Sequence, residues 1–433
     1  MLSDFFKQRT INLSVKENIS SSQTLFKNIT AFSFLQIMNY VFPLITIPYV
    51  VRVLGAEKFG LVSFIAAFVG YFTLLTDYGF NFSATRSISI HRENHSLVAE
   101  ILISVYTIKT ILFIVSSFIF IILIYFVPVF MAEKELCIVS YLSVFGALLV
   151  PQWYFQGISK MSVITWITFF VRMTVVIMVF TLVKEENDYK TYALLNSAGS
   201  AFIGLLAVSF VLKKFRTIKS LNRPTFYTVL REGGLMFISN ISINLYTSSN
   251  TFILGLFAPA PIVGYWSAAD KIRMAVQGIL SPITQGLYPH LAHLFSQSKE
   301  KAIEFIKKSF LPIGLTGFLV SLALLLFVEP ISSLLLGNKF SHSLILIKLI
   351  SFLPFIILLS NFFGIQILLN LNGSGEFSFT VFIAGIFNIA LSLLIVPKML
   401  AVGTAISVLM TEVIVTALMM YFAIRRLYAE KGN

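Results

Sequence analysis

The 433-residue chain has few charged residues and a single cysteine. Asp, Glu, Lys and Arg make up only 12% of it, against about 25% in an ordinary soluble domain, which excludes that class of protein. The one cysteine, Cys137, excludes an internal disulfide and a cysteine-based metal site. We expect no cleavable signal peptide, because residues 1–28 are polar and charged and lack a short apolar core.

Motifs of catalysis are also missing. The chain contains no Gly-rich phosphate loop, which excludes an ATP-driven pump acting by itself. Its five histidines show no spacing with acidic residues that would indicate a metal site. The segments between apolar stretches are too short to house a soluble catalytic domain. We therefore predict a protein that is not an enzyme and that has no cofactor and no metal.

What the chain has instead is a series of apolar stretches between about residue 29 and residue 424. A helix needs about 20 apolar residues to cross a bilayer. The sequence therefore predicts an all-α integral membrane protein of about twelve transmembrane helices. The predicted spans are 29–53, 60–82, 101–128, 136–157, 161–183, 190–212, 230–257, 262–289, 309–328, 344–370, 377–397 and 402–424.

Lys and Arg are unequally distributed between the two sides of these spans. With the N-terminus in the cytoplasm, cytoplasmic segments carry twenty of the 32 Lys and Arg, the opposite side seven, and the spans five. Loops rich in Lys and Arg face the cytoplasm, so both termini are predicted to be cytoplasmic. The net charge of +13 is then a signal of topology, and we expect no nucleic-acid partner. The predicted division is a tail at 1–28, six-helix lobes at 29–212 and 230–424, a basic cytoplasmic linker at 213–229 and a tail at 425–433.

One short motif occurs twice. Gly60-Leu61-Val62-Ser63 opens the second predicted span, and Gly264-Tyr265-Trp266-Ser267 opens the eighth, 204 residues later. Six spans separate the two copies, so both halves have the same orientation in the membrane. The repeat predicts two lobes related by an axis along the membrane normal, as in several transporter folds.

Polar residues follow one face of several spans. A helix advances about 100° per residue, which places Asp270, Arg273 and Gln277 on one face of span eight. In hydrocarbon such groups need partners or water. We infer that spans one, two, seven and eight line a central cavity between the lobes, although helix packing through Ser and Asn remains an alternative for any single residue. The predicted cavity-lining polar residues are Gln36, Asn39, Tyr40, Asn240, Asn244, Asn250 and Gln277.

Five cations lie inside the predicted spans, where each costs roughly 2.5–3.5 kcal/mol on insertion scales. Lys109 and Lys348 lie nearer the span ends, and we expect their amines to snorkel to the interface. The other three, Arg172, Lys271 and Arg273, are the predicted substrate-binding cations. A membrane cavity lined by cations favours an anionic substrate.

Three carboxylates accompany these cations inside the spans: Asp77, Asp270 and Glu412. Each could pair with a cation or bind a coupling proton or sodium ion. Asp270 and Arg273 are three residues apart on one helix, so a purely structural ion pair is an open alternative.

Four stretches carry a family resemblance. They are Leu54-Gly55-Ala56-Glu57-Lys58-Phe59-Gly60, Asp77-Tyr78-Gly79-Phe80 with Ala84-Thr85-Arg86, Pro151-Gln152-Trp153-Tyr154-Phe155-Gln156-Gly157, and Val263-Gly264-Tyr265-Trp266-Ser267-Ala268-Ala269-Asp270-Lys271-Ile272 with Ser281-Pro282-Ile283 and Leu287-Tyr288-Pro289. Over its whole length the chain resembles the O-antigen (Wzx-type) flippases, which belong to the polysaccharide transporter branch of the multidrug/oligosaccharidyl-lipid/polysaccharide exporter superfamily.

The resemblance implies two six-helix lobes around a central cavity in the bacterial cytoplasmic (inner) membrane. It implies that an undecaprenyl-diphosphate-linked oligosaccharide for O-antigen, lipopolysaccharide or other surface polysaccharide is flipped across the lipid bilayer. The implied mechanism is alternating access driven by an ion gradient. It also implies a functional association with a polysaccharide polymerase and a chain-length regulator. No residue-level site follows from it, because the family's contact positions are not fixed by motif.

Two other functions remain open. A multidrug or cation antiporter of the same superfamily would want a net acidic lining, whereas the intramembrane charges here sum to +2. A membrane polysaccharide polymerase or glycosyltransferase would be expected to carry a large loop with catalytic groups, which this sequence lacks.

Overall fold

The computed structural model describes residues 2–214, 222–247, 249–337 and 340–429. Within these ranges side chains are described except at 2–29, 31–32, 40, 214, 235, 238–240, 242–247, 285–286, 289 and 428–429. All the long elements in the described ranges are helices, and no strand occurs in them. The predicted all-α fold class is confirmed.

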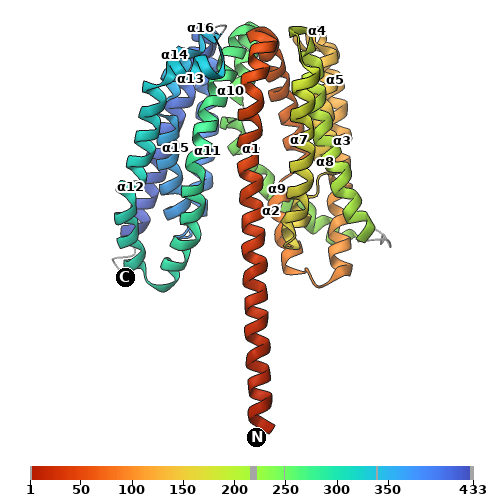
Figure 1. Cartoon of the computed structure of the whole chain (residues 1–433), viewed down its shortest axis with the longest axis vertical. Coiled ribbons are helices and arrows are strands. Elements are labelled where there is room, and N and C mark those ends of the chain that lie inside the picture. Colours follow the sequence, from red (N-terminus) through yellow and green to blue (C-terminus); the bar gives the residue numbers. More distant parts are fainter. Residues whose placement is uncertain (1, 215–221, 248, 338–339, 430–433) are drawn as a thin grey trace.

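The N-terminal lobe comprises α1 to α8, and its helices α3, α5, α7 and α8 stand on the right of α1 in Figure 1. The first part of α1, which was predicted to be a tail, is helical and extends beyond the rest of the molecule (Figure 1). The bounds are α1 Leu2–Asp77, α2 Phe80–Ile90, α3 His95–Phe126, α4 Pro128–Ala132, α5 Lys134–Leu149, α6 Gln152–Gly157, α7 Met161–Leu182 and α8 Tyr189–Lys214.

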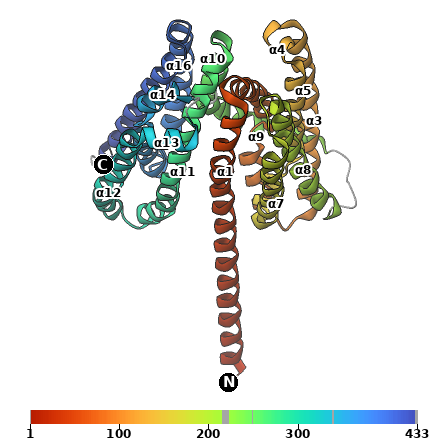
Figure 2. The ribbon, with the colours of Figure 1, turned by 45° about the horizontal axis from the view of Figure 1, so that its top comes forward.

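The C-terminal lobe comprises α9 to α16, and its helices α11 to α16 stand on the other side of α1. Figure 2 shows the same two groups of helices after a rotation of 45°. The bounds are α9 Arg223–Thr247, α10 Ser249–Phe257, α11 Ala260–Gln297, α12 Lys299–Leu326, α13 Val328–Leu335, α14 Ser343–Ile350, α15 Leu353–Asn361, a π-helix at Phe362–Leu368, and α16 Ser374–Ala429.

Two helices contain a reversal that separates two predicted spans. In α1 the break is at Gly55, with φ 67°, a left-handed conformation that costs glycine little because it has no Cβ atom. In α16 the break is at Leu400, with φ 49°. Each of these helices therefore supplies two crossings, spans one and two in α1 and spans eleven and twelve in α16.

Eight stretches of the described chain are long and apolar enough to cross a membrane. Two of them, Ser33–Ile90 with 58 residues and Ser374–Leu427 with 54, are double spans. Predicted spans seven and eight are absent from this set. They correspond to α9–α10 and α11, which carry the predicted polar stripes, so their mean hydropathy is lower than that of the other spans.

The apolar cores show where the two lobes join. One large core combines residues of both lobes at the end of the molecule that contains Gly55, including Phe68 of α1 and Trp266 of α11. Away from that end the cores are separate, one around Trp153 in the N-terminal lobe and one around Phe362 in the C-terminal lobe. The lobes are therefore held together mainly at the Gly55 end, and α9 contacts both of them elsewhere.

Candidate functional site

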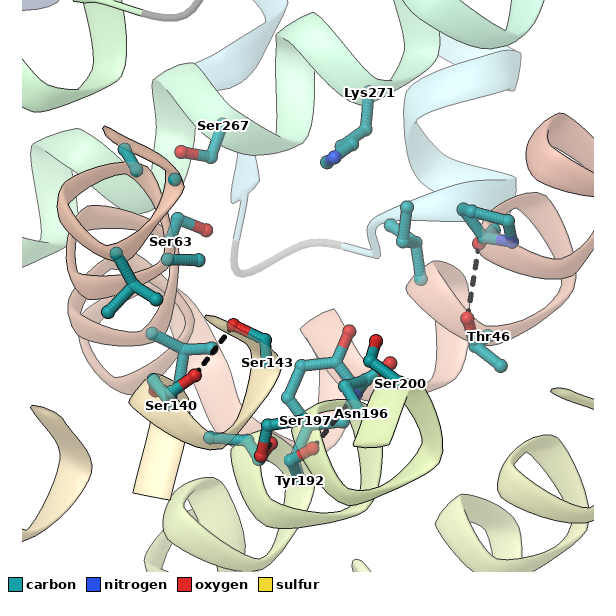
Figure 3. Close-up of a pocket in the computed structure, with 18 of the residues that line it drawn as sticks. Thr46, Ser63, Ser140, Ser143, Tyr192, Asn196, Ser197, Ser200, Ser267 and Lys271 are labelled. Carbon is teal, nitrogen blue, oxygen red and sulfur yellow. Dashed lines mark hydrogen bonds between the residues drawn. The ribbon is translucent and has the colours of Figure 1, made fainter. Parts of the chain in front are cut away.

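A cavity of about 1120 Å³ lies between the lobes. Its walls come from α1, α5, α7 and α8 of the N-terminal lobe and from α10 and α11 of the C-terminal lobe. Figure 3 shows Ser267 and Lys271 of α11 on one side of it and the serines of α5 and α8 on the opposite side. Spans one, two and eight line the cavity as predicted, and Thr251 of span seven contributes to it.

A second, smaller compartment of about 300 Å³ adjoins the cavity. It lies between α1, α11 and the end of α13, and most of its lining is apolar, including Leu44, Ile272 and Leu335. Asn39, Pro43, Ile47, Lys271 and Met274 line both volumes, so the two volumes are adjacent. We call this volume the side compartment.

Two of the predicted substrate-binding cations face the cavity without an anionic partner. Arg172 of α7 donates from Nη1 to Oδ1 of Asn39 at 2.6 Å, and no carboxylate forms a salt bridge with it among the described residues. Lys271 is exposed to the cavity and has no hydrogen bond or ion pair with a described residue. A neutral amide holds the guanidinium of Arg172 without cancelling its charge, so both cations remain available to an anion.

Arg273, the third predicted cation, is neutralised. Its Nε lies 2.7 Å from Oδ1 of Asp270. Glu412 of α16, the third predicted carboxylate, is only 7% exposed. The structural ion pair left open by the sequence is therefore present. The carboxylate of Asp270 offsets the cost of burying the guanidinium of Arg273.

The prediction that Lys109 snorkels is wrong. Its side chain is 1% exposed and its Nζ lies 3.1 Å from Oδ1 of Asp77 and 2.6 Å from the Ala147 carbonyl oxygen. A buried ammonium needs such partners, and the sequence separation of Lys109 and Asp77 concealed them. Lys348 does lie near a helix end, is 48% exposed and contacts Glu329 at 3.5 Å.

The other predicted lining residues divide into three groups. Asn39 lines both volumes and Gln36 lines the side compartment. Asn250 is buried at 5% exposure, and Gln277 has a buried Oε1 without a partner among the described residues; neither lines the cavity. The side chains of Tyr40, Asn240 and Asn244 lie outside the described part of the chain.

Sequence reasoning missed the contribution of spans four and six. Ser140 and Ser143 of α5 and Tyr192, Asn196 and Ser200 of α8 all line the cavity. The three residues on α8 are four apart and therefore share one helix face. This four-residue spacing is the feature of the sequence that could have predicted a polar face on span six.

The cavity is closed at the Gly55 end by the two copies of the repeated motif. A Cβ atom on Gly60 would lie 1.9 Å from the Ala260 carbonyl oxygen, and one on Gly264 would lie 2.0 Å from that of Ala56. Phe252 of α10 adds a stacked contact with Phe64 of α1, with ring centroids 5.8 Å apart.

Arg52 reinforces the same end. It donates to the carbonyl oxygens of Ser333, at 3.3 Å, and of Leu334 in the last turn of α13. A cation at a helix C-terminus satisfies carbonyls that lack helical partners. These contacts join the lobes at this end and leave the cavity beneath them.

Among the described residues, no group of three or more His, Cys, Asp and Glu side chains could hold a metal ion. The cavity lining supplies cations, hydroxyls and amides, which can bind a ligand through charge and hydrogen bonds.

Comparison with known proteins identifies the family. The family model described as "Polysaccharide biosynthesis protein" matches residues 25–295, more than half of the chain. The chain belongs to this family. It is 32% identical over 400 residues to the "Putative O-antigen transporter" of Escherichia coli (strain K12), covering 92% of this chain and 96% of that protein. A protein of the same name from Shigella dysenteriae is 29% identical over 404 residues, with 91% and 98% covered.

Solved structures show the same fold. The "Lipid II flippase MurJ, inward closed conformation" superposes with a TM-score of 0.71 at 13% identity, covering 92% of this chain and 87% of that one. An inward-facing multidrug resistance MATE family transporter of the MOP superfamily gives 0.66 at 14% identity, covering 93% and 99%. The family member described here is thus a membrane transporter with the two-lobe fold of that superfamily.

Proposed function

We propose that this protein moves an undecaprenyl-diphosphate-linked oligosaccharide across the bacterial cytoplasmic membrane for O-antigen or another surface polysaccharide. Its family and its curated relatives support a polysaccharide cargo. The observation that carries the proposal is the pair Arg172 and Lys271, which face one cavity with no carboxylate partner among the described residues. A diphosphate is the fixed anion of such a substrate, and charge-assisted hydrogen bonds are the strongest that a protein offers it.

The shape of the site supports an amphipathic cargo. The cavity is rich in hydroxyl and amide side chains, whereas the side compartment is mostly apolar. Lys271 and Asn39 line both, at their junction. A lipid-linked sugar has its diphosphate at the corresponding junction between hydrocarbon and carbohydrate.

The proposed mechanism is alternating access, with residues 29–212 and 230–424 as the two lobes. Lys and Arg are in excess in the loops on the side of the membrane opposite the Gly55 end. This excess supports placing the Gly55 end outside the cytoplasm and both termini inside it. The structure would then be a state closed to the outside. Reporter fusions at residues 135 and 300 test this topology, and a cytoplasmic signal at 135 would contradict it.

We assign ion coupling to Glu412. Asp77 and Asp270 are held in salt bridges of 3.1 and 2.7 Å, whereas Glu412 is buried and does not line the cavity. Glu412→Gln is expected to leave substrate binding unchanged and to abolish the response of transport to an imposed ion gradient. Gradient-dependent transport by this variant in proteoliposomes would remove Glu412 from the coupling step.

The diphosphate contact is tested by Arg172→Gln and Lys271→Gln in a host deleted for its own copy. Loss of one hydrogen bond to a charged group costs about 1.5–3 kcal/mol, or roughly 10- to 150-fold in binding. We expect surface polysaccharide to fall and lipid-linked repeat units to accumulate, at unchanged protein level. Lys348→Gln is the matched control, because this exposed lysine lies away from the cavity. Normal polysaccharide in both cavity variants would refute the contact.

The charges of the lining speak against export of cationic drugs. Arg172, Lys271 and Arg273 outnumber Asp270, the one acidic residue among those that line the cavity. A cationic dye would therefore meet a repulsive field. Efflux of cationic dyes by reconstituted protein would favour that function instead.

A further inference from the structure

One wall of the cavity is neutral and densely polar. It consists of Ser140 and Ser143 of α5 and Tyr192, Asn196 and Ser200 of α8, and we call these five residues the hydroxyl–amide wall. Figure 3 shows them together on the side of the cavity opposite Ser267 and Lys271. All five come from the N-terminal lobe, whereas three of the four charged lining residues come from α11. Most of the charged lining residues therefore lie on the other side of the cavity from these neutral groups.

The two helices that carry the hydroxyl–amide wall, α5 and α8, pack closely against each other. A Cβ atom on Gly146 of α5 would lie 2.6 Å from the backbone of Ser200, and one on Gly204 of α8 would lie 2.7 Å from Leu149. Ser197 links the same helices by donating to the Val139 carbonyl oxygen at 2.8 Å. Because the two backbones are in direct contact, the spacing of the wall side chains is fixed before a ligand arrives.

The wall retains hydrogen-bonding capacity. Asn196 is exposed to the cavity, and its Nδ2 donates one hydrogen bond to the Tyr192 carbonyl oxygen at 2.8 Å. An amide also has a second N–H and a carbonyl oxygen. Ser143 donates to the Ser140 carbonyl at 2.7 Å, which leaves its oxygen as an acceptor. Mixed donors and acceptors of this kind match the hydroxyl and acetamido groups of a sugar.

Helix packing does not explain the side chain of Asn196. It does explain Ser197, which is 4% exposed and has two acceptors at 2.8 Å, the Val139 carbonyl oxygen of the neighbouring helix and the Ala193 carbonyl oxygen of its own helix. Asn196, by contrast, bonds only within its own helix in the hydrogen bonds described, and its side chain projects into the cavity (Figure 3). A polar group placed this way in a membrane protein faces water or a ligand.

We infer that the hydroxyl–amide wall is the carbohydrate subsite, which reads the neutral hydroxyl and acetamido groups of the repeat unit. This inference rests on the proposed function, in which Arg172 and Lys271 hold the diphosphate. The wall contains no carboxylate, so it offers no counter-charge to a free amino sugar. Selectivity among repeat units then resides in α5 and α8, and affinity for the lipid diphosphate resides in α7 and α11.

The test compares two probes on purified protein in nanodiscs. One is undecaprenyl diphosphate without sugar, and the other is the lipid-linked repeat unit extracted from the host lacking this protein. Tyr192→Phe, Asn196→Leu and Ser200→Ala each remove hydrogen-bonding groups of the wall. A neutral hydrogen bond contributes about 0.5–1.5 kcal/mol, so each variant is expected to weaken binding of the glycosylated probe roughly 2- to 12-fold. Binding of the bare diphosphate should not change.

Ser209→Ala is the matched control, since Ser209 is also on α8 but bonds the Leu206 carbonyl and does not line the cavity. The inference would be overturned if Tyr192→Phe and Ser200→Ala weakened the binding of both probes equally, or weakened the binding of neither. These two substitutions are small, so they keep the test valid if Asn196→Leu misfolds. The proposed function fails separately, if wild-type protein ignores the bare diphosphate or if Arg172→Gln binds it as well as wild type.

Discussion

The helices α1 and α11 cross at the repeated motif, and we expect no room there for an added methyl group. At Gly60 the added Cβ atom would lie 1.9 Å from the Ala260 carbonyl oxygen. To restore ordinary contact the helices must separate by about 1.5 Å, the difference between that distance and the 3.4 Å at which normal contact begins. The obstacle is backbone rather than a flexible side chain, so Gly60→Ala must move the lobes apart.

The expected size of the effect of Gly60→Ala follows from packing energies. Overpacking a close contact costs about 1–3 kcal/mol, which is roughly 5- to 150-fold in a conformational equilibrium. Gly70→Ala is the matched control, because Gly70 lies on the same helix and a Cβ atom there meets nothing within 4 Å. Both variants gain similar helix propensity, about 0.5–1 kcal/mol. Gly70 lines the cavity, so Gly70→Ala controls the distance between the lobes and not the transport rate.

The measurement is a distance between the lobes at the Gly55 end. Spin labels at Glu135 and Glu329, both exposed, report it in a Cys137→Ser background. We expect Gly60→Ala and Gly264→Ala to shift the distribution to longer distances and to slow transport, and we expect Gly70→Ala to keep the wild-type distance. If Gly60→Ala keeps the wild-type distance and transport rate, the two backbones do not meet at this crossing and the reasoning is wrong.

Two further predictions concern the buried ion pairs. Lys109→Met leaves the Ala147 carbonyl and the Asp77 carboxylate without their partner, and should lower stability by about 1–3 kcal/mol; thermal unfolding of detergent-purified protein measures it, and adding Asp77→Asn should recover part of the loss. Recovery of none would mean that the amine, not the pair, is what stabilises this region. Arg273→Gln should reduce the amount of protein in the membrane, because Asp270 loses its compensating charge, and adding Asp270→Asn should partly restore it. Normal protein level with lost transport would instead place Arg273 in contact with substrate.

The fold could be predicted because its signals are local. Apolar runs set the spans, and Gly55 marks the reversal between the first two. The broken helices were harder to foresee. Predicted span ten is divided among α14, α15 and a π-helix, and predicted span four between α5 and α6. Neither break changes the hydrophobicity that located the span.

The site could be predicted only in part, because pairing is a property of three dimensions. Helix periodicity alone could suggest the contact of Asp270 with Arg273, three residues apart. It could not show that Asp77 reaches Lys109 across 32 positions, nor that Arg172 meets Asn39 across 133. The sequence therefore ranked Arg273 with Arg172 as a substrate contact, whereas the structure leaves Arg172 and Lys271 as the cations without a carboxylate among the described residues.

The repeated motifs and the cavity walls differ in symmetry, and we expect them to differ in function. Ala56 and Gly60 meet Ala260 and Gly264 through equivalent contacts, as expected for motifs repeated in both lobes. The cavity walls are not equivalent, since α5 and α8 line the cavity and the corresponding spans ten and twelve do not. When the lobes move relative to each other, both copies of the repeated motif must move equally, so this function is suited to a motif that is present in both lobes. Binding of an asymmetric ligand does not require equivalent residues in the two lobes. Substitutions at the repeated glycines should therefore affect every substrate alike, whereas those on α5 and α8 should discriminate among sugars.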